Sequence, residues 1–204
     1  MRIAVLSATL TAALLLAPPA SAQAPGAPAP AFTLTDTSGK TVQLSDYRGK
    51  YVVLEWTNPE CPFVRKHYDS GNMQDLQKQW GARDVVWLSI NSTNTSSSEY
   101  KTPAQMAQWL GGKGASPKAV LIDGTSATGR AYGARTTPQM FVINPAGTVI
   151  YNGAIDDRRT TNPADAKSAH NYVRAALTEA MDGRPVTVAT TSPYGCSVKY
   201  GALY

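Results

Sequence analysis

The most informative part of this chain is Tyr51-Val-Val-Leu-Glu-Trp56 and the segment after it, Thr57-Asn58-Pro59-Glu60-Cys61-Pro62-Phe63-Val64. The first stretch is rich in β-branched and aromatic residues, which is typical of a strand buried within a sheet. Proline is favoured in the first turn of a helix, so we expect a helix to begin at Pro62. Cys61 is therefore expected at a helix N-terminus, shortly after a buried strand.

The segments on either side predict alternating strands and helices. The expected elements are a hairpin over 32–44, a helix over 62–80 interrupted at 70–72, a strand over 85–91, a helix over 103–110 capped by Thr102, a strand over 118–122, a short helix over 126–132, a hairpin over 139–151 and a helix over 163–181 capped by Asn162. This order predicts an α/β fold, a mixed sheet with helices on both faces.

The composition excludes several classes of protein. The chain has 204 residues, 43% hydrophobic and 16% charged, with 19 Lys+Arg against 14 Asp+Glu. Such a chain is neither a disordered polyelectrolyte nor a multi-span membrane protein. The basic residues form no long run and no aromatic-rich stripe, so no nucleic-acid partner is expected.

The first 22 residues are typical of a secretory signal peptide. A basic Arg2 precedes an uncharged apolar stretch, and Ala20-Ser21-Ala22 forms a small-residue cleavage site. A membrane anchor is the alternative, but the apolar stretch is short for a bilayer. We expect an exported protein, periplasmic or secreted and free of the membrane after cleavage. Residues 23–31, rich in Pro and Ala, are expected to be an extended linker, followed by one domain over 32–182.

Cys61 is the strongest candidate for chemistry. The free amide groups and the dipole of a helix N-terminus, here beginning at Pro62, favour the nucleophilic thiolate. Arg65 lies one turn further on the same face and adds a positive charge, whereas the carboxylate of Glu60 opposes ionisation. The alternative is that Cys61 is a buried hydrophobe or half of a structural disulfide.

These segments, together with Thr136-Thr137-Pro138 before a hairpin and a final helix, resemble the thioredoxin superfamily. The opening hairpin, Pro30 to Lys50, resembles more narrowly the redoxin branch, which contains the alkyl hydroperoxide reductase and thiol-specific antioxidant proteins. The resemblance covers roughly residues 31–181. It implies a thioredoxin-like sheet preceded by an N-terminal hairpin, Cys61 as the attacking thiol, and a cis Pro138 facing it. A substrate groove would then be formed by Trp56, Thr57, Thr137 and Pro138.

The chain departs from two patterns of this superfamily. Val64 occupies the place of the second cysteine of a C-x-x-C motif, and Leu54 and Asn58 replace the two signature residues of a peroxiredoxin, with Thr57 one place away. These departures weigh against dithiol reduction by a C-x-x-C motif and against ordinary peroxidase action.

The second cysteine, Cys196, lies in the tail over 183–204. It has two possible roles, which the sequence leaves open: resolving a mixed disulfide or sulfenic acid on Cys61, or tying the tail to the domain by a permanent disulfide. Reach is no obstacle, because the residues between the last helix and Cys196 can extend about 45 Å.

The sequence thus predicts a thiol oxidoreductase without cofactor or metal. Its expected partners are protein or small-molecule disulfides or peroxides and an external thiol reductant. A fold alone does not determine function, so two alternatives stay open: a thiol peroxidase of peroxiredoxin type that lacks the usual Thr, and a non-catalytic binding module with a structural Cys61–Cys196 disulfide. Asp156-Asp157 is expected to be a polar turn rather than a cation site, and His67 is not assigned as a base because it lies on another face of the helix from Cys61.

The first prediction concerns export. The mature protein should begin at Gln23, because the cleavage site ends at Ala22. N-terminal sequencing of the exported fraction measures this directly, and a fraction that begins at Met1 would contradict it.

Overall fold

The structure is a computed structural model that describes residues 24–201, so the expected signal peptide lies outside the described residues. The strands are β1 (Thr33–Asp36), β2 (Thr41–Gln43), β3 (Val52–Trp56), β4 (Val86–Asn91), β5 (Ala119–Ile122), β6 (Thr136–Thr137), β7 (Gln139–Ile143), β8 (Val149–Gly153) and β9 (Cys196–Ser197). The helices are the 3-10 helix η1 (Leu44–Tyr47) and the α-helices α1 (Pro62–Asp69), α2 (Asn72–Gly81), α3 (Pro103–Gly112), α4 (Ala127–Tyr132), α5 (Pro163–Ser168) and α6 (Tyr172–Met181).

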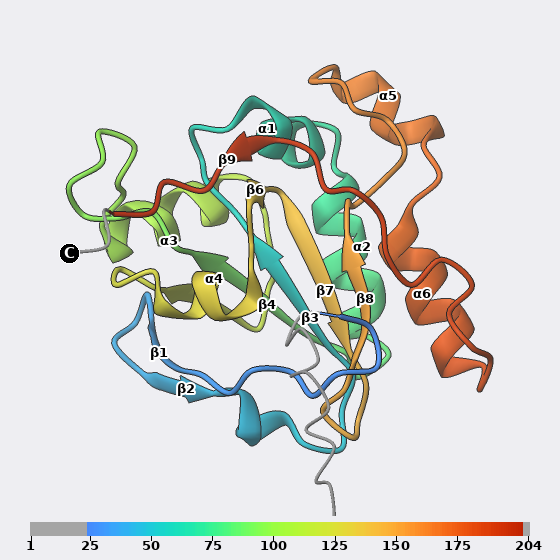
Figure 1. The fold of residues 1–204 in the computed structure, drawn as a ribbon. Coiled ribbons are helices and arrows are strands. Elements are labelled where there is room, and N and C mark those ends of the chain that lie inside the picture. The colour runs from blue at the N-terminus through green and yellow to red at the C-terminus, as the bar shows by residue number, and fades with distance from the viewer. Residues whose placement is uncertain (1–23, 202–204) are drawn as a thin grey trace, which may run out of the picture.

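A mixed sheet forms the centre of the domain (Figure 1). Its strand order is β2-β1-β5-β4-β3-β7-β8. Strands β3, β4 and β5 are parallel neighbours, whereas β7 is antiparallel to β3 and begins the final hairpin. Every residue of β3, β4 and β7 is buried, as expected for central strands covered on both faces.

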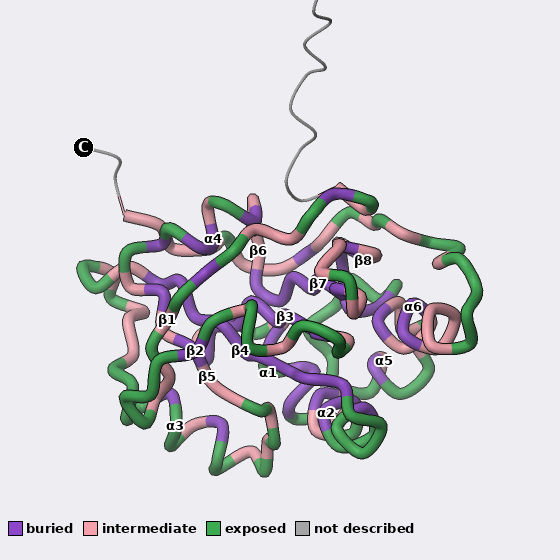
Figure 2. The backbone as a smooth tube through the Cα atoms, turned by 90° about the horizontal axis from the view of Figure 1, so that it is seen from below, coloured by how far each residue is buried: buried purple, intermediate pink, exposed green. Residues whose placement is uncertain are grey.

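The two faces of the sheet support separate clusters of buried side chains. One cluster joins α1, α2, α3 and α6 to the sheet and contains Cys61. The other contains Tyr132 of α4 and the aromatic side chains of Trp56 and Phe141. Figure 2 shows these buried segments enclosed by exposed loops and helix faces. Cys61 therefore lies on the face of the sheet that α1 covers.

Most of the predicted elements are confirmed. The helix expected over 62–80 is two helices, α1 and α2, separated at the expected place by Gly71, whose φ of +79° favours glycine. Thr102 caps α3, accepting a hydrogen bond from the Gln105 amide at 3.2 Å. The hairpins β1–β2 and β7–β8 and the buried strands β3, β4 and β5 occupy the predicted segments.

The prediction of one final helix over 163–181 is wrong, because α5 and α6 are separate. Tyr172 donates its backbone N–H to the Ile155 carbonyl at 3.0 Å, and Asn171 forms a β-bridge with Asp156. Because of these backbone contacts with the loop after β8, the residues between α5 and α6 are not helical. Asn171 then caps α6, accepting from the Arg174 amide at 2.9 Å.

The segment predicted as a linker is instead packed on the domain where it is described, from residue 24 onward. Gly26 donates to the Val149 carbonyl at 2.8 Å, and Val149 donates to the Ala27 carbonyl at 2.9 Å. Ala27 is buried. Proline and alanine do not oppose this arrangement, because an extended segment can lie along a strand without helical hydrogen bonds.

The tail contains an element that the sequence does not reveal, the short strand β9. It pairs with β6 in a two-stranded sheet outside the main one (Figure 1). Residues 193–201 thus run back across the domain, past α1 and toward α4. Within residues 24–201, none of the helices has the length and apolar character needed to cross a membrane.

The second prediction concerns the start of α6. Asn171→Ala removes the side-chain acceptor of this cap and should lower the free energy of unfolding by about 1 kcal/mol. Asn171→Ser, which keeps an acceptor, is the matched control and should lose less. Urea denaturation followed by circular dichroism measures both, and equal stabilities of the Ala variant and the parent would contradict the prediction.

Candidate active site

Cys61 lies where the polypeptide leaves β3 and enters α1. It is the N-cap residue of α1, with Pro62 in the first helical turn as predicted. Its side chain is fully buried, and its thiol donates a hydrogen bond to the Thr137 carbonyl at 3.0 Å. The thiol thus lies between a helix N-terminus and the loop before β7.

The Thr137–Pro138 peptide bond is cis, which confirms the prediction made from the resemblance. Thr137 ends β6, and in the β6–β9 pair it lies directly opposite Cys196. One residue, Thr137, therefore contacts both cysteines, which are far apart in the sequence. Both cysteines are in the thiol form in this structure.

Gly195 allows the tail to approach the cis-proline loop closely. Its φ is +141°, and a Cβ at this position would lie 2.0 Å from the Thr137 carbonyl oxygen, far inside van der Waals contact. The obstructing atom belongs to the backbone, so it cannot rotate away as a flexible side chain would. Glycine is therefore required here if Cys196 is to remain opposite Thr137.

Cys61 directly affects the pKa of Cys196. Burial, and next the hydrogen bond with Cys61, raise the pKa of Cys196 to about 12. While the tail is seated, Cys196 is thus a neutral thiol at physiological pH.

Arg65 lies one helical turn after Cys61, but its side chain binds other groups. Its Nε donates to the Pro59 carbonyl at 2.7 Å, and its Nη2 pairs with Glu60 at 3.0 Å. Glu60 also pairs with Lys101 at 2.6 Å. The hydrogen bond with Lys101 lowers the pKa of the Glu60 carboxyl, despite some desolvation. The predicted effect of Arg65 on the thiolate stays a prediction.

The residues predicted to form a groove have different surroundings. Trp56 is fully buried against Tyr132 and Phe141 on the opposite face of the sheet, with ring centroids 5.2 Å away in both cases. Its assignment to a groove is therefore corrected: successive strand residues point to opposite faces, and this one points into the core. Thr57 and Thr137 are also buried, and within residues 24–201 the hydroxyl of Thr137 has no hydrogen-bond partner.

The sequence analysis missed a buried carboxylate in β3, Glu55. Its carboxylate accepts hydrogen bonds from Tyr68 at 2.7 Å, Trp87 at 2.8 Å and Ser89 at 2.9 Å. Burial raises the pKa of Glu55 in spite of these hydrogen bonds. The sequence did contain a signal for this cluster, because Glu55 is an acidic residue within an otherwise apolar strand. A buried carboxylate needs hydrogen-bond donors around it.

A second missed cluster surrounds the tail just before Cys196. Lys66 and His67 of α1, Asp156 after β8 and Tyr194 of the tail are all buried and lie within hydrogen-bond or ion-pair distance of one another. The sequence analysis assigned no role to Lys66 and did not assign His67 as a base. Asp156 was expected only as part of a polar turn, and its burial against Lys66 could not be foreseen because that partner is distant in the sequence.

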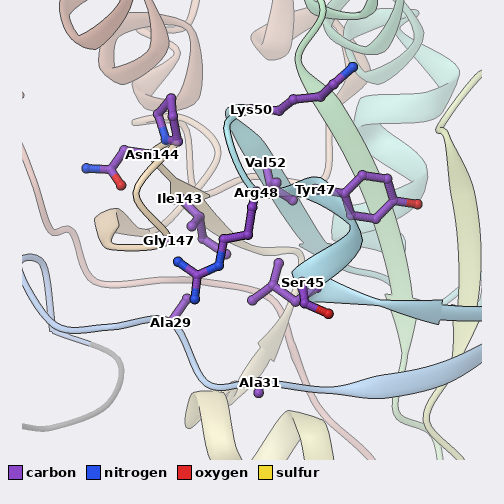
Figure 3. A pocket seen from close by; sticks show the side chains of 12 residues that line it. Ala29, Ala31, Ser45, Tyr47, Arg48, Lys50, Val52, Ile143, Asn144 and Gly147 are labelled. Carbon is purple, nitrogen blue, oxygen red and sulfur yellow. The ribbon is translucent and has the colours of Figure 1, made fainter.

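A small pocket of about 60 Å³ lies at the other end of the sheet (Figure 3). Its lining includes Val52 at the start of β3 and Arg48, whose Nη1 donates to the Ala146 carbonyl at 2.6 Å. Cys61 follows the opposite end of β3, so this pocket is separate from the thiols. In the described part of the chain, no group of three or more His, Cys, Asp or Glu side chains is arranged to hold a metal ion.

Residues 25–152 match the family described as AhpC/TSA. The chain belongs to the AhpC/TSA family. The resemblance to the redoxin branch of the thioredoxin superfamily is thereby confirmed. The thioredoxin-like fold is confirmed as well, since solved structures of that fold match the chain.

The individual relatives have low sequence identity to this chain. The thiol-disulfide oxidoreductase ResA of Bacillus subtilis is 28% identical over 125 residues, 61% of this chain and 64% of that protein. Peroxiredoxin-2 of Cricetulus griseus is 33% identical over 134 residues, 60% of this chain and 65% of that protein. Both matches span slightly less than two thirds of the relative. A conserved protein of Geobacillus kaustophilus has a similar structure, with a TM-score of 0.79, 28% identity and coverage of 89% of this chain and 95% of that one.

The third prediction tests the close approach of the tail. Gly195→Ala should separate β9 from β6, because the added Cβ collides with the Thr137 carbonyl. Cys61 would then be exposed, and its rate of alkylation by iodoacetamide should rise at least about tenfold.

Gly183→Ala is the matched control. Gly183 also has a positive φ, +72°, but no atom lies within 4 Å of an added Cβ. This variant also places alanine at a positive φ, and it should leave the alkylation of Cys61 unchanged because nothing obstructs the added Cβ. Equal rates in the Gly195 variant and the parent would show that the tail does not need this approach to cover Cys61.

Proposed function

We propose that this protein is an exported thiol–disulfide oxidoreductase in which Cys61 is the nucleophile and Cys196 the resolving thiol. The observation that carries this proposal is the position of Cys196 opposite Thr137, whose carbonyl accepts the Cys61 thiol. Membership of the AhpC/TSA family supports thiol chemistry in general. Export rests on the expected signal peptide over residues 1–22.

The proposed cycle has two exchange steps. The Cys61 thiolate attacks one sulfur of a substrate disulfide, so that a mixed disulfide forms and the other substrate sulfur leaves as a thiolate. The Cys196 thiolate then attacks the Cys61 sulfur, forming the Cys61–Cys196 disulfide and releasing the second substrate thiolate. The substrate gains two electrons and takes up two protons, and an external thiol reductant returns the cysteine pair to its reduced form.

Val64 explains why a tail thiol is needed for this cycle. It occupies the third position after Cys61, where a C-x-x-C motif has its second thiol, and its side chain is buried in the core. A hydrocarbon side chain cannot attack a disulfide. Cys196 is the other cysteine of the sequence, and the direct influence of Cys61 on its pKa supports an exchange between them.

The burial of Cys61 implies that the tail moves during this cycle. A protein disulfide cannot reach a fully buried sulfur. The tail must therefore leave β6 when a large substrate binds and return when the mixed disulfide is resolved. Such local opening requires less free energy than global unfolding.

Reduction of a small peroxide is the second candidate function. The buried hydroxyl of Thr137, which has no partner in residues 24–201, lies on the residue that binds the Cys61 thiol. A peroxide is small enough to reach Cys61 through a lesser opening. Here the thiolate attacks the terminal oxygen of the peroxide, the O–O bond breaks, and Cys61 becomes a sulfenic acid while the other oxygen leaves as hydroxide or alkoxide. The Cys196 thiol then attacks the Cys61 sulfur, so that the disulfide forms and the sulfenic hydroxyl leaves as water.

The fourth prediction separates these roles. In Cys196→Ser, one addition of a disulfide substrate should leave Cys61 as a stable mixed disulfide, and turnover with a protein reductant should be lost. With peroxide in place of the disulfide, the same variant should accumulate a sulfenic acid that dimedone traps. Mass spectrometry of the intact protein identifies either adduct.

Cys61→Ser is the control and should form no adduct at residue 61 with either substrate. If Cys196→Ser instead turns over as fast as the parent with a protein reductant alone, an external thiol completes the reaction and Cys196 has no resolving role.

A further inference from the structure

Two residues before Cys196, the tail inserts Tyr194 into a buried cluster of charged side chains. The side chains of Lys66 and Asp156 are 0% and 1% exposed, and Lys66 Nζ lies 3.3 Å from Asp156 Oδ2. Lys66 Nζ also donates to the Arg158 carbonyl at 2.5 Å. Two charges withdrawn from water in this way need further hydrogen bonds to offset their desolvation.

The Tyr194 hydroxyl supplies part of that compensation. It donates to Asp156 Oδ1, which also accepts from the Arg158 amide at 3.0 Å. It lies 3.3 Å from Lys66 Nζ, which donates to it. Burial and the hydrogen bond with Asp156 raise the pKa of Tyr194, so the hydroxyl stays protonated as a donor.

His67 completes the cluster as a neutral ring. Burial and the neighbouring Lys66 lower the pKa of His67 to about 3. Its Nδ1 lies 3.0 Å from Asn72 Nδ2, a donor, so the proton of the neutral imidazole belongs on Nε2. That N–H faces the Tyr194 oxygen at 3.5 Å. The tyrosine ring also packs edge-on against Phe63, with centroids 5.8 Å apart.

The cluster and Cys61 belong to one rigid element. Lys66 follows Cys61 by five residues on α1, a rise of about 7.5 Å along a helix axis. Cys196 follows Tyr194 by two residues, about 6.6 Å along an extended chain. The two spacings agree, so a tail held with Tyr194 at Lys66 brings Cys196 to the level of Cys61.

From these contacts we infer that Tyr194 is the positioning residue of the resolving thiol: by completing the Lys66–Asp156 cluster it holds Cys196 beside Cys61. This inference rests on the proposed function. On the other side of Cys196, Val198 donates to the Arg135 carbonyl at 3.0 Å and Tyr200 to the Ala134 carbonyl at 2.6 Å. These contacts anchor the tail beyond Cys196, whereas Tyr194 fixes it before Cys196.

The experiment measures how readily Cys61 and Cys196 form their disulfide in a glutathione redox buffer. Tyr194→Phe keeps the ring against Phe63 but removes the hydroxyl, so the equilibrium constant for the intramolecular disulfide should fall about tenfold. Tyr194→Ala should lower it further. Tyr51→Phe is the matched control, since it removes a tyrosine hydroxyl that donates to the Ala180 carbonyl at the far end of β3, and it should leave the constant unchanged.

A second measurement separates positioning from general stability. In the reduced protein, an undocked Cys196 moves into water, and its pKa returns from about 12 toward the ordinary value near 8.5. Alkylation of Cys196 at pH 8 should therefore become faster in both Tyr194 variants, while disulfide formation becomes weaker. The Tm of each protein is recorded as well. A variant that only lost stability would show a lower Tm without these changes in Cys196 alkylation and disulfide formation.

Each outcome bears on one statement. If both Tyr194 variants match the parent in disulfide formation and in Cys196 alkylation, the inference is wrong. If the parent itself forms no Cys61–Cys196 disulfide under oxidising conditions, the proposed function is wrong. The positioning role of Tyr194 is then tested by the alkylation of Cys196 alone: faster alkylation in the Tyr194 variants supports it, and an unchanged rate overturns it.

Discussion

The backbone of Thr137 is the point on which the arrangement of the two cysteines depends. The Thr137 carbonyl oxygen accepts a hydrogen bond from the Cys61 thiol, and Thr137 pairs with Cys196 between β6 and β9. The same carbonyl oxygen lies so close to residue 195 that only glycine fits there. A buried carbonyl needs a hydrogen-bond donor. The thiol that meets this need is the one proposed to carry the chemistry, so the packing of the loop and the environment of the reactive sulfur cannot be altered separately.

The parts of this fold that depend on local chemistry could be predicted from the sequence. Pro62 begins α1, Gly71 separates α1 from α2, and Thr102 caps α3, because each of these residue types has a strong local preference at such a position. The buried strand β3 was equally evident from its β-branched and aromatic residues. The cis bond before Pro138 came from the resemblance to a family and not from the residues alone.

What could not be predicted depends on partners distant in the sequence. Lys66 and Asp156 are polar residues in polar neighbourhoods of the sequence, and their burial follows only from the folding of α1, the loop after β8 and the tail onto one another. The strand β9 contains two residues, too few to show a periodic pattern, and it forms because β6 presents a free edge. The break before α6 likewise results from a backbone bridge between Asn171 and Asp156.

The pairing of β9 with β6 also affects how the protein acquires its structure. The tail follows every other element of the described fold, yet it covers a helix that begins at residue 62. During vectorial synthesis or translocation, the sheet and α1 can form before the residues that cover Cys61 emerge. For that interval the sulfur is open to any oxidant or foreign thiol in the compartment. A nascent chain therefore passes through a stage in which Cys61 is not covered by the tail, and a folding catalyst that acts on thiols would find Cys61 accessible only then.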